Sequence, residues 1–272
     1  MVVTATTELP PCCVQVHPAD ESVVLIGTYK LEEDGARHGS VDVYRYNGDE
    51  LKVHSQYATE TSVLDIKFSP FDNSCVVTAH SEGTIVVWKY DHETQSLSVV
   101  GNWCLFDKDV LVTSVVFSPT TNGVLLATLT SGELAIVDLN TQSVQMLATS
   151  HDLECWISNF GELGQLSSVV YTGGDDSKLI AHDLRTNDAI WTTTTRHHTA
   201  GVVSILSPNQ NWNVENGNHL WSGCYDDNLR IFDLRVMDRA NPGLIPGYIP
   251  KVLKEENLGG GVWRLIPSHK DN

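Results

Sequence analysis

The chain of 272 residues carries 34 acidic and 17 basic side chains, for a formal net charge of −17, and 41% of its residues are hydrophobic. This composition is that of a globular protein and excludes an intrinsically disordered chain. The negative field repels phosphate backbones, so direct nucleic-acid binding is not expected, whereas a cationic partner would be attracted.

The sequence shows no targeting segment or metal-binding motif. No apolar run approaches the roughly 18 residues of a membrane span, and the N-terminal MVVTATTELPPCC lacks the basic and apolar regions of a secretory signal. The six cysteines form no CxxC pair, and the eleven histidines show no ligand spacing with carboxylates or thiols. We therefore expect a cytoplasmic protein that uses no metal or cofactor and binds no membrane.

Two kinds of strand-like segment alternate along the chain. The first kind is a short apolar run closed by a turn residue: VQVHP (14–18), VLDIKFSP (63–70), SVVFSP (114–119), CWISNF (155–160), VVSILSP (202–208) and VWRLIP (262–267). The second kind places an aromatic residue or a substitute for it near its end: GSVDVYRY (39–46), GTIVVWKY (83–90), GELAIVDL (132–139), SKLIAHDL (177–184) and DNLRIFDL (227–234). Both kinds are rich in β-branched and aromatic residues, which is typical of strands.

The repeat predicts an all-β fold, a WD-repeat β-propeller. The recurring position falls at Tyr44, Trp88, Val137, His182 and Phe232, with a spacing of 44 to 50 residues, and such a period with several short strands per unit is typical of propeller blades. This position resembles the Trp of the Trp-Asp pair in WD repeats. We count five blades and the first strand of a sixth, as in an incomplete seven-bladed ring. A single propeller domain over 1–272 is expected, truncated or lacking a segment, because closed rings protect their strand edges.

The repeated Gly/Asp turns in YTGGDDSKLIAHDLR (171–185) and WSGCYDDNLRIFDLR (221–235) predict a structural role. In WD repeats a turn Asp binds a His, which reaches a Ser or Thr and the Trp-Asp position; we call this set the hydrogen-bonded tetrad. Such a tetrad satisfies buried polar groups and performs no chemistry. The expected members are His151 and Asp176 in blade four, and Asp226, Ser222 and either His197 or His198 in blade five.

Residues that do not repeat are better candidates for function. Blade four opens with HDLECWISNF (151–160), blade five with RHHTAGVVSI (196–205), and the sixth repeat with NLGGGVWRLIP (257–267). All three segments enter the innermost strands of consecutive blades, so we expect them to be neighbours at one rim. An alternative role for the two tryptophans of these segments is to wedge between blades. The rim candidates are Glu154, Trp156, Gly259, Gly260, Gly261, Trp263 and Arg264.

Five of these motifs together resemble one WD-repeat family. The set HDLExWI, YTGGDDS, RHHTxGVxSI, SGxYDD and GGGVWR, in order over residues 151–264, is similar to the diphthine methyl ester hydrolases of diphthamide biosynthesis, in their fungal form. Residues 1–150 match only as generic blades. The resemblance implies hydrolysis of the methyl ester of methylated diphthine on translation elongation factor 2, which prepares the side chain for amidation, with other diphthamide-pathway proteins as further partners.

The substrate's chemistry suggests roles for the rim residues. Its trimethylammonium group would bind aromatic faces and carboxylates, which Trp156, Trp263, Glu154 and Asp175 would supply. His198, or His197 if His198 belongs to the tetrad, is the expected base, and the amides of Gly259, Gly260 and Gly261 would hold the oxyanion. Cys224 and Ser204 are weaker candidates for a nucleophile, and His182 is expected in the core.

The main alternative is a scaffold without catalytic activity. Most propellers bind proteins, and fold alone does not indicate an enzyme. HDLR (182–185) and FDLR (232–235) resemble the Trp-Asp-x-Arg box of substrate receptors for cullin-type ubiquitin ligases. Arg185 and Arg235 would then bind the ligase adaptor, unless each pairs with a neighbouring Asp.

Overall fold

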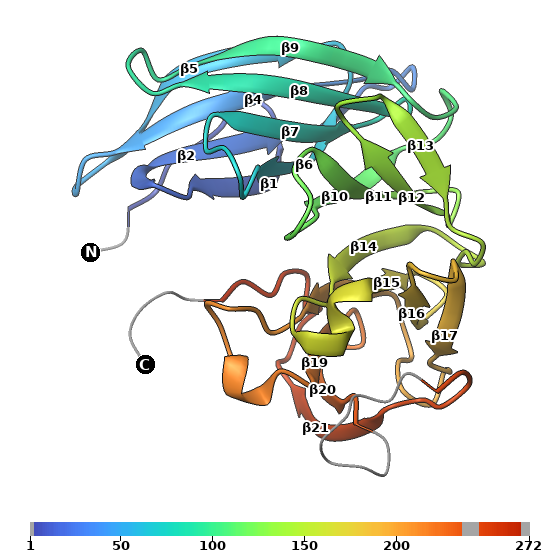
Figure 1. Cartoon of the computed structure of the whole chain (residues 1–272). Coiled ribbons are helices and arrows are strands. Elements are labelled where there is room, and N and C mark those ends of the chain that lie inside the picture. Colours follow the sequence, from blue (N-terminus) through green and yellow to red (C-terminus); the bar gives the residue numbers. More distant parts are fainter. Residues whose placement is uncertain (1–2, 236–244, 268–272) are drawn as a thin grey trace. The chain divides into compact units, whose positions relative to one another are not determined.

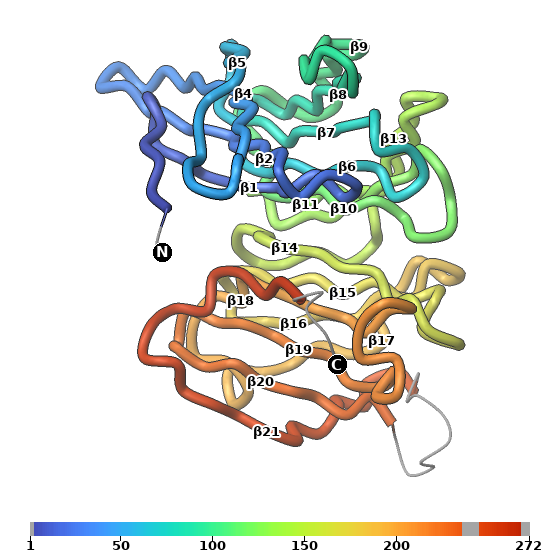
Figure 2. Tube along the Cα trace, turned by 90° about the vertical axis from the view of Figure 1, so that its left-hand side faces the viewer, coloured from blue at the N-terminus to red at the C-terminus, as the bar shows by residue number. Residues whose placement is uncertain are grey.

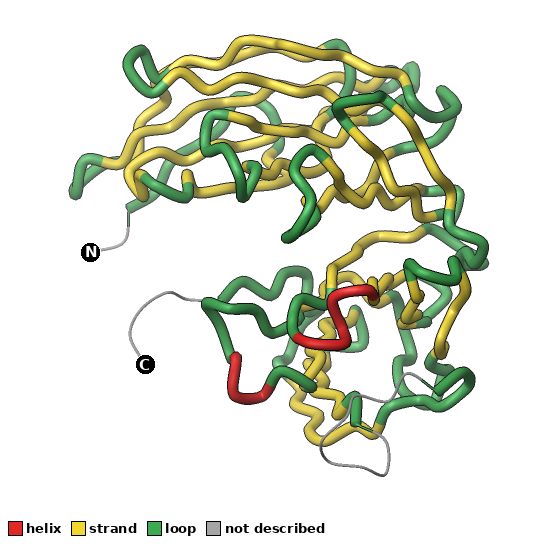
Figure 3. Tube along the Cα trace, in the orientation of Figure 1, coloured by secondary structure: helices red, strands yellow, loops and turns green. Residues whose placement is uncertain are grey.

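The computed structural model describes residues 3–235 and 245–267. Strands and turns make up almost all of this part of the chain, and the helical segments are two short 3-10 helices, Gly164–Ser168 (η1) and Val214–Asn216 (η2) (Figure 3). Within these ranges no helix has the length and apolar character needed to cross a membrane.

The strands form five antiparallel sheets in chain order, which confirms the five predicted blades (Figure 1). Blade one contains β1 (Pro11–His17), β2 (Asp20–Thr28), β3 (Lys30–Leu31), β4 (Arg37–Tyr46) and β5 (Leu51–Thr59). Blade two contains β6 (Val63–Phe68), β7 (Cys75–His80), β8 (Thr84–Asp91) and β9 (Ser96–Cys104). Blade three contains β10 (Val112–Phe117), β11 (Val124–Leu129), β12 (Leu134–Asp138) and β13 (Ser143–Met146). Blade four contains β14 (Cys155–Phe160), β15 (Val169–Gly174), β16 (Leu179–Asp183) and β17 (Asp188–Thr192). Blade five contains β18 (Val202–Leu206), β19 (His219–Cys224), β20 (Asn228–Asp233) and β21 (Lys251–Asn257).

The chain divides into two compact units. Unit 1 consists of Met1–Ala127 and Asp138–Gln142, and unit 2 consists of Thr128–Val137 and Ser143–Asn272. The core of unit 1 includes Val43, Ile66 and Trp88, and the core of unit 2 includes Tyr171, Leu220 and Phe232. The candidate site residues lie in unit 2, in which the strands of blade five follow one another in order from β18 to β21 (Figure 2).

The third strand of blade four and the last strand of blade five differ sharply in burial. Every residue of β16, the third strand of blade four, is buried, whereas β21, at the edge of blade five, exposes all its residues but one, the half-buried Val252. An interior strand must be apolar on both faces, and an edge strand remains soluble through charged side chains. The sequences LIAHD and KVLKEEN follow this division.

The repeated Asp turns adopt the same conformation in both blades. Ser177 and Asp227 occupy equivalent positions with positive φ of 62° and 67°, and the Asp before each accepts a backbone N–H two residues on, from Lys178 at 3.1 Å and from Asn228 at 3.2 Å. Side-chain bonds of this kind close tight turns. The turns therefore have the structural role that the repeat predicts.

The expected first strand of a sixth blade does not adopt strand geometry. Residues 262–267 belong to no strand, but the segment lies along blade five, where the Val262 N–H donates to the carbonyl of Cys224 at 3.0 Å and the Leu265 N–H donates to Ser204 Oγ at 2.8 Å. Residues 268–272, on which the prediction of an interrupted blade rested, lie outside the described residues. That prediction, and that of one domain over 1–272, remain predictions.

Candidate functional site

Blade four contains a complete hydrogen-bonded tetrad. Asp176 Oδ1 accepts from His151 Nδ1 at 2.8 Å, His151 Nε2 meets Thr172 Oγ1 at 2.9 Å, and Thr172 Oγ1 meets His182 Nε2 at 2.9 Å. Although burial alone would raise it, the bond from His151 and its positive charge when protonated lower the pKa of Asp176 to about 2. The predicted structural pair of His151 and Asp176 is present, and His182 is in the core as expected.

His182 performs the task that an indole performs in blade two. There Trp88 Nε1 donates to Thr78 Oγ1 at 2.8 Å, and Thr78 Oγ1 lies 2.6 Å from His80 Nε2. Burial lowers the pKa of His182 to about 3, so the ring is neutral and its Nε2–H can replace the indole N–H. A neutral imidazole thus preserves the hydrogen-bond pattern without the Trp.

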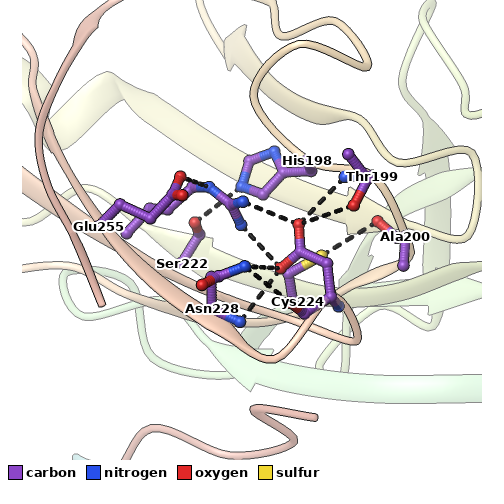
Figure 4. A network of polar contacts seen from close by, with 9 residues as sticks. His198, Thr199, Ala200, Ser222, Cys224, Asn228 and Glu255 are labelled. Carbon is purple, nitrogen blue, oxygen red and sulfur yellow. Dashed lines mark hydrogen bonds and ion pairs between the residues drawn. The ribbon is translucent and has the colours of Figure 1, made fainter. Parts of the chain in front are cut away.

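Blade five departs from this pattern (Figure 4). His198 Nε2 lies 2.9 Å from Ser222 Oγ, as a tetrad member should, but His198 Nδ1 is buried and has no partner. The Phe232 ring occupies the Trp-Asp position and offers no donor. The expected bond between His198 and Asp226 is therefore absent.

Asp226 is instead held by a buried arginine. Arg230 Nη1 lies 2.9 Å from Asp226 Oδ1, Arg230 Nη2 lies 2.8 Å from Asp226 Oδ2, and Arg230 Nε binds Glu255 Oε2 at 2.6 Å. The two blades share the same strand register but differ in one residue. Arg230 lies opposite Ser222 in blade five, whereas Ile180 lies opposite Thr172 in blade four. Burial acts to raise the pKa of Asp226, but the guanidinium lowers it well below its usual range.

These contacts place His198, rather than His197, in the tetrad. Its side chain is fully buried, and burial together with the nearby charge of Arg230 lowers its pKa to about 3, so it cannot take a proton from a bound water. His197 is half-buried, and its Nδ1 lies 3.3 Å from both the backbone N–H and the hydroxyl of Thr194. His197 is thus the histidine of the pair outside the tetrad, although its ring contact is with Phe232 rather than with a rim residue.

The two weaker candidates for a nucleophile are engaged in structure. Cys224 is buried, its Sγ contacts the carbonyl of Ala200 at 3.2 Å, and burial raises its pKa. Ser204 is buried and accepts the N–H of Leu265. Neither side chain presents its reactive atom to solvent.

Two of the three predicted rim segments, 151–160 and 257–267, come together at three aromatic rings. The centroids of Trp156 and Trp263 are 6.3 Å apart, and those of Tyr225 and Trp263 are 5.4 Å apart. Trp263 is 38% exposed and Tyr225 is 49% exposed, whereas Trp156 is half-buried, so two of the three rings are open to solvent. We call Trp156, Tyr225 and Trp263 the aromatic cluster.

A carboxylate lies beside the aromatic cluster. Asp175 is half-buried in the turn before β16, its N–H donates to the carbonyl of Glu154 at 2.9 Å, and its carboxylate lies so close to Gly201 that a Cβ there would collide with it. Burial raises the pKa of Tyr225, the negative charge of Asp175 raises it further, and the positive charge of Arg264 opposes both effects. The backbone also links Asp175 to Tyr225, because Gly201, against which the Asp175 carboxylate packs, accepts the Tyr225 N–H at 3.0 Å.

Of the remaining rim candidates, Gly261 and Arg264 contact rings of the aromatic cluster. A Cβ at Gly261 would stand 2.8 Å from the Tyr225 ring, so this position requires glycine, and the Arg264 guanidinium lies 5.2 Å from the centroid of Trp263. Gly259 has a φ of 75° and donates its N–H to Asn257 Oδ1 at 3.0 Å. This amide is therefore not free to hold an oxyanion, contrary to the prediction. Gly260 is exposed, and Glu154 is half-buried with its carbonyl engaged by Asp175.

Comparisons with known proteins give the family. No family model matches the chain. Curated diphthine methyltransferase of Saccharomyces cerevisiae is 38% identical over 309 positions, which cover 97% of this chain and 78% of that protein. The chain belongs to the diphthine methyltransferase family. The curated diphthine methyltransferases of Schizosaccharomyces pombe and Homo sapiens are 31% and 24% identical and are covered over 74% and 52% of their lengths.

Membership in the diphthine methyltransferase family bears out the resemblance to a family of diphthamide biosynthesis, and these relatives are named for methyl transfer rather than ester hydrolysis. The match with the S. cerevisiae protein is longer than the 272 residues of this chain, so that relative has residues within the matched region that this chain lacks.

Solved structures show the same fold. Sqt1 from Chaetomium thermophilum superimposes with a TM-score of 0.66 at 12% identity, over 93% of this chain and 62% of the Sqt1 chain. A chain of the mitotic checkpoint complex superimposes with a TM-score of 0.63 at 16% identity, over 96% of this chain and 72% of that chain. The WD-repeat propeller fold predicted for this member of the diphthine methyltransferase family is thus confirmed.

The two Asp-Leu-Arg boxes make local pairs in this family member. Arg185 Nε binds Asp183 Oδ1 at 2.9 Å, and Arg235 Nε binds Asp233 Oδ1 at 2.7 Å. Each guanidinium is bound by the carboxylate two residues before it, which is the local pairing weighed against the ligase-adaptor role. The comparisons do not favour a scaffold or ligase receptor.

Two site residues were not predicted from the sequence. Tyr225 lies within the SGxYDD motif. Its contact with Trp263 depends on the path of residues 257–267 along blade five, which the motif does not specify. Arg230 was recognisable in principle, because it places a charge where the equivalent strand has the apolar Ile180. In the part of the chain that the structure describes, no group of three or more His, Cys, Asp or Glu residues is placed to hold a metal ion.

Proposed function

We propose that the protein hydrolyses the methyl ester of methylated diphthine on translation elongation factor 2, freeing the carboxylate for amidation. The observation that carries this proposal is the open aromatic cluster with Asp175 beside it. Aromatic faces and a carboxylate attract a quaternary ammonium group such as the trimethylammonium of diphthine, with about 0.5–2 kcal/mol for each good ring contact. The cluster projects to solvent, which suits a side chain presented by another protein.

The hydrolysis needs one base and one site for developing negative charge. A water molecule adds its oxygen to the ester carbonyl carbon and gives its proton to the base, and the tetrahedral intermediate then expels methoxide, which takes up a proton and leaves as methanol. The trimethylammonium group on the adjacent carbon withdraws electrons from the carbonyl. Because the carbonyl is activated in this way, a carboxylate is a strong enough base to take the proton from the attacking water.

Asp175 is the proposed base, because it lies next to the aromatic cluster. His197 is the second candidate, since it is outside the tetrad, but its observed contacts are with Thr194 and Phe232. The amides of Gly260 and Gly261 are the proposed donors to the oxyanion, because the Gly259 amide already binds Asn257. Glu154 adds a second negative charge near the same rim.

A second candidate reaction follows from the name of the curated relatives, which is diphthine methyltransferase. Transfer of a methyl group to the diphthine carboxylate would use the same aromatic cluster for the trimethylammonium group. Methyl transfer requires a methyl donor. It would increase the mass of the modified histidine by one methylene unit, whereas ester hydrolysis would decrease it by the same amount.

The deciding experiment follows the mass of the modified histidine of elongation factor 2. The protein is incubated with the factor in its methyl ester form and, separately, in its free acid form with S-adenosylmethionine. Loss of one methylene unit from the ester supports hydrolysis, gain of one by the acid supports methyl transfer, and no change in either mixture refutes both.

Two variants and a control connect the reaction to the site. We expect Asp175→Asn to slow the reaction at least ~100-fold, since general base catalysis contributes about 10²–10⁴. Trp263→Ala should raise KM by about 3- to 30-fold through the lost cation–π contact. Asp188→Asn, which neutralises an exposed carboxylate of the same blade, is the matched control and should leave both constants unchanged.

A further inference from the structure

The aromatic cluster contains a cation from this chain. The Arg264 guanidinium carbon lies 5.2 Å from the centroid of Trp263, the ring that also contacts Trp156 and Tyr225. Arg264 Nη1 additionally approaches the carbonyl of Trp263 at 3.5 Å. The central ring of the cluster is thus already in contact with a positive charge.

A guanidinium at this place affects ligands in opposite ways. It repels a bare quaternary ammonium ion on the same ring and competes with it for the π-electrons. It attracts a carboxylate or a polarised ester carbonyl, for which its planar donors are well suited. A ligand that carries both groups on one carbon would place the ammonium on the rings and the carboxyl group on Arg264.

The site also has an unused donor. Trp156 Nε1 is buried and has no hydrogen-bond partner among the described residues, and a buried N–H left without a partner is unfavourable. A carboxyl oxygen that reached this N–H would satisfy it. Arg264 and Trp156 thus supply two donors, and Asp175 supplies the negative charge.

We infer that Arg264 makes the aromatic cluster specific for trimethylammonio carboxylates and their esters rather than for quaternary ammonium ions in general. This inference rests on the proposed function, whose product is such a zwitterion. Arg264 is then a specificity residue: it pairs with the carboxyl end of the ligand and disfavours cations that lack one. The alternative is that Arg264 only covers the Trp263 ring, in which case its loss would affect both ligand types alike.

The test compares two small probes on the purified full chain. N,N,N-trimethylglycine carries an ammonium and a carboxylate, whereas tetramethylammonium carries the ammonium alone. Dissociation constants are measured from the methyl proton resonances of each probe during titration. The proteins are the wild type, Arg264→Gln, and the control Arg185→Gln, which removes the same charge from an exposed arginine bound to Asp183.

The two probes should respond to Arg264→Gln in opposite directions. Trimethylglycine should bind roughly 10-fold more weakly, as expected for a lost charge-assisted contact, and tetramethylammonium should bind about 2- to 5-fold more tightly once the competing cation is gone. Arg185→Gln should change neither constant. Shifts in the same direction, no shift, or no binding of either probe to the wild type would overturn the inference.

The outcome is separable from that of the proposed function. If the wild type removes the methyl group from elongation factor 2 but the two probes respond alike, the specificity role of Arg264 fails and the esterase remains. If the probes respond in opposite directions while the mass of the factor does not change, the recognition role stands and the hydrolysis fails.

Discussion

Replacing Arg230 by Ile, the residue at the equivalent position of blade four, should allow His198 to bind Asp226, as His151 binds Asp176 in blade four. In the native protein Arg230 is buried and bound to Asp226 and Glu255, while His198 Nδ1 has no partner. Removing one member of a buried ion pair costs about 3–5 kcal/mol. A new bond from His198 Nδ1–H to the released Asp226 should return about 1.5–3 kcal/mol, and the buried isoleucine adds about 1.5–3 kcal/mol.

The net loss of unfolding free energy for Arg230→Ile should therefore be below ~2 kcal/mol. Urea denaturation measures the loss, and NMR titration of His198 tests its cause. Because Arg230 lowers the pKa of His198 and Asp226 raises it, the pKa should rise above its present value of about 3. A loss of the full ~3–5 kcal/mol with an unchanged His198 pKa would refute the reasoning. Glu255→Gln, on a half-exposed partner, is the control and should cost less than ~1 kcal/mol.

Three further results are expected. Burial lowers the pKa of His80 to about 4 and of His182 and His198 to about 3. Because the unfolded chain binds these protons near pH 6.5, the unfolding free energy from urea denaturation should be constant above about pH 7 and fall below pH 6.5, by about 1.4 kcal/mol for each histidine at pH 5.5. A constant unfolding free energy down to pH 5 would contradict the burial. Tyr225→Phe keeps the ring and should leave KM for the modified factor within about 2-fold, whereas Tyr225→Ala should raise it at least ~3-fold; equal effects would show that the hydroxyl, not the ring face, matters. Gly201→Ala should displace the Asp175 carboxylate and lower kcat at least ~10-fold with little change in the melting temperature, and unchanged kcat would remove Asp175 from the mechanism.

The blades could be predicted because their signal repeats. The recurring position, at Tyr44, Trp88, Val137, His182 and Phe232, lies on a strand inside each sheet and is buried in all five blades, and periodic burial leaves a periodic pattern in the sequence. The meeting of the rim segments was also predictable, since entrances to the innermost strands of consecutive blades are neighbours in any propeller. Trp156 and Trp263 accordingly lie in contact.

The details of the site depended on side-chain partners that no spacing reveals. The choice between His197 and His198 was decided by which imidazole reaches Ser222, and the missing Asp226 bond was decided by Arg230 on the neighbouring strand. Residues 262–267 form no strand, and they contact blade five through Cys224 and Ser204. Such outcomes depend on tertiary competition between partners rather than on local pattern.

The exposure of Trp263 and Tyr225 has a kinetic consequence. Because two of its rings are exposed, the aromatic cluster holds a small cation only through weak contacts. Free metabolites with a quaternary nitrogen should therefore dissociate rapidly and have short residence times. A side chain carried on a large protein gains additional contacts around the rim, which raise its effective concentration at the rings. Residence time, rather than the chemistry of the ammonium group, would then separate the macromolecular ligand from the pool of small ones.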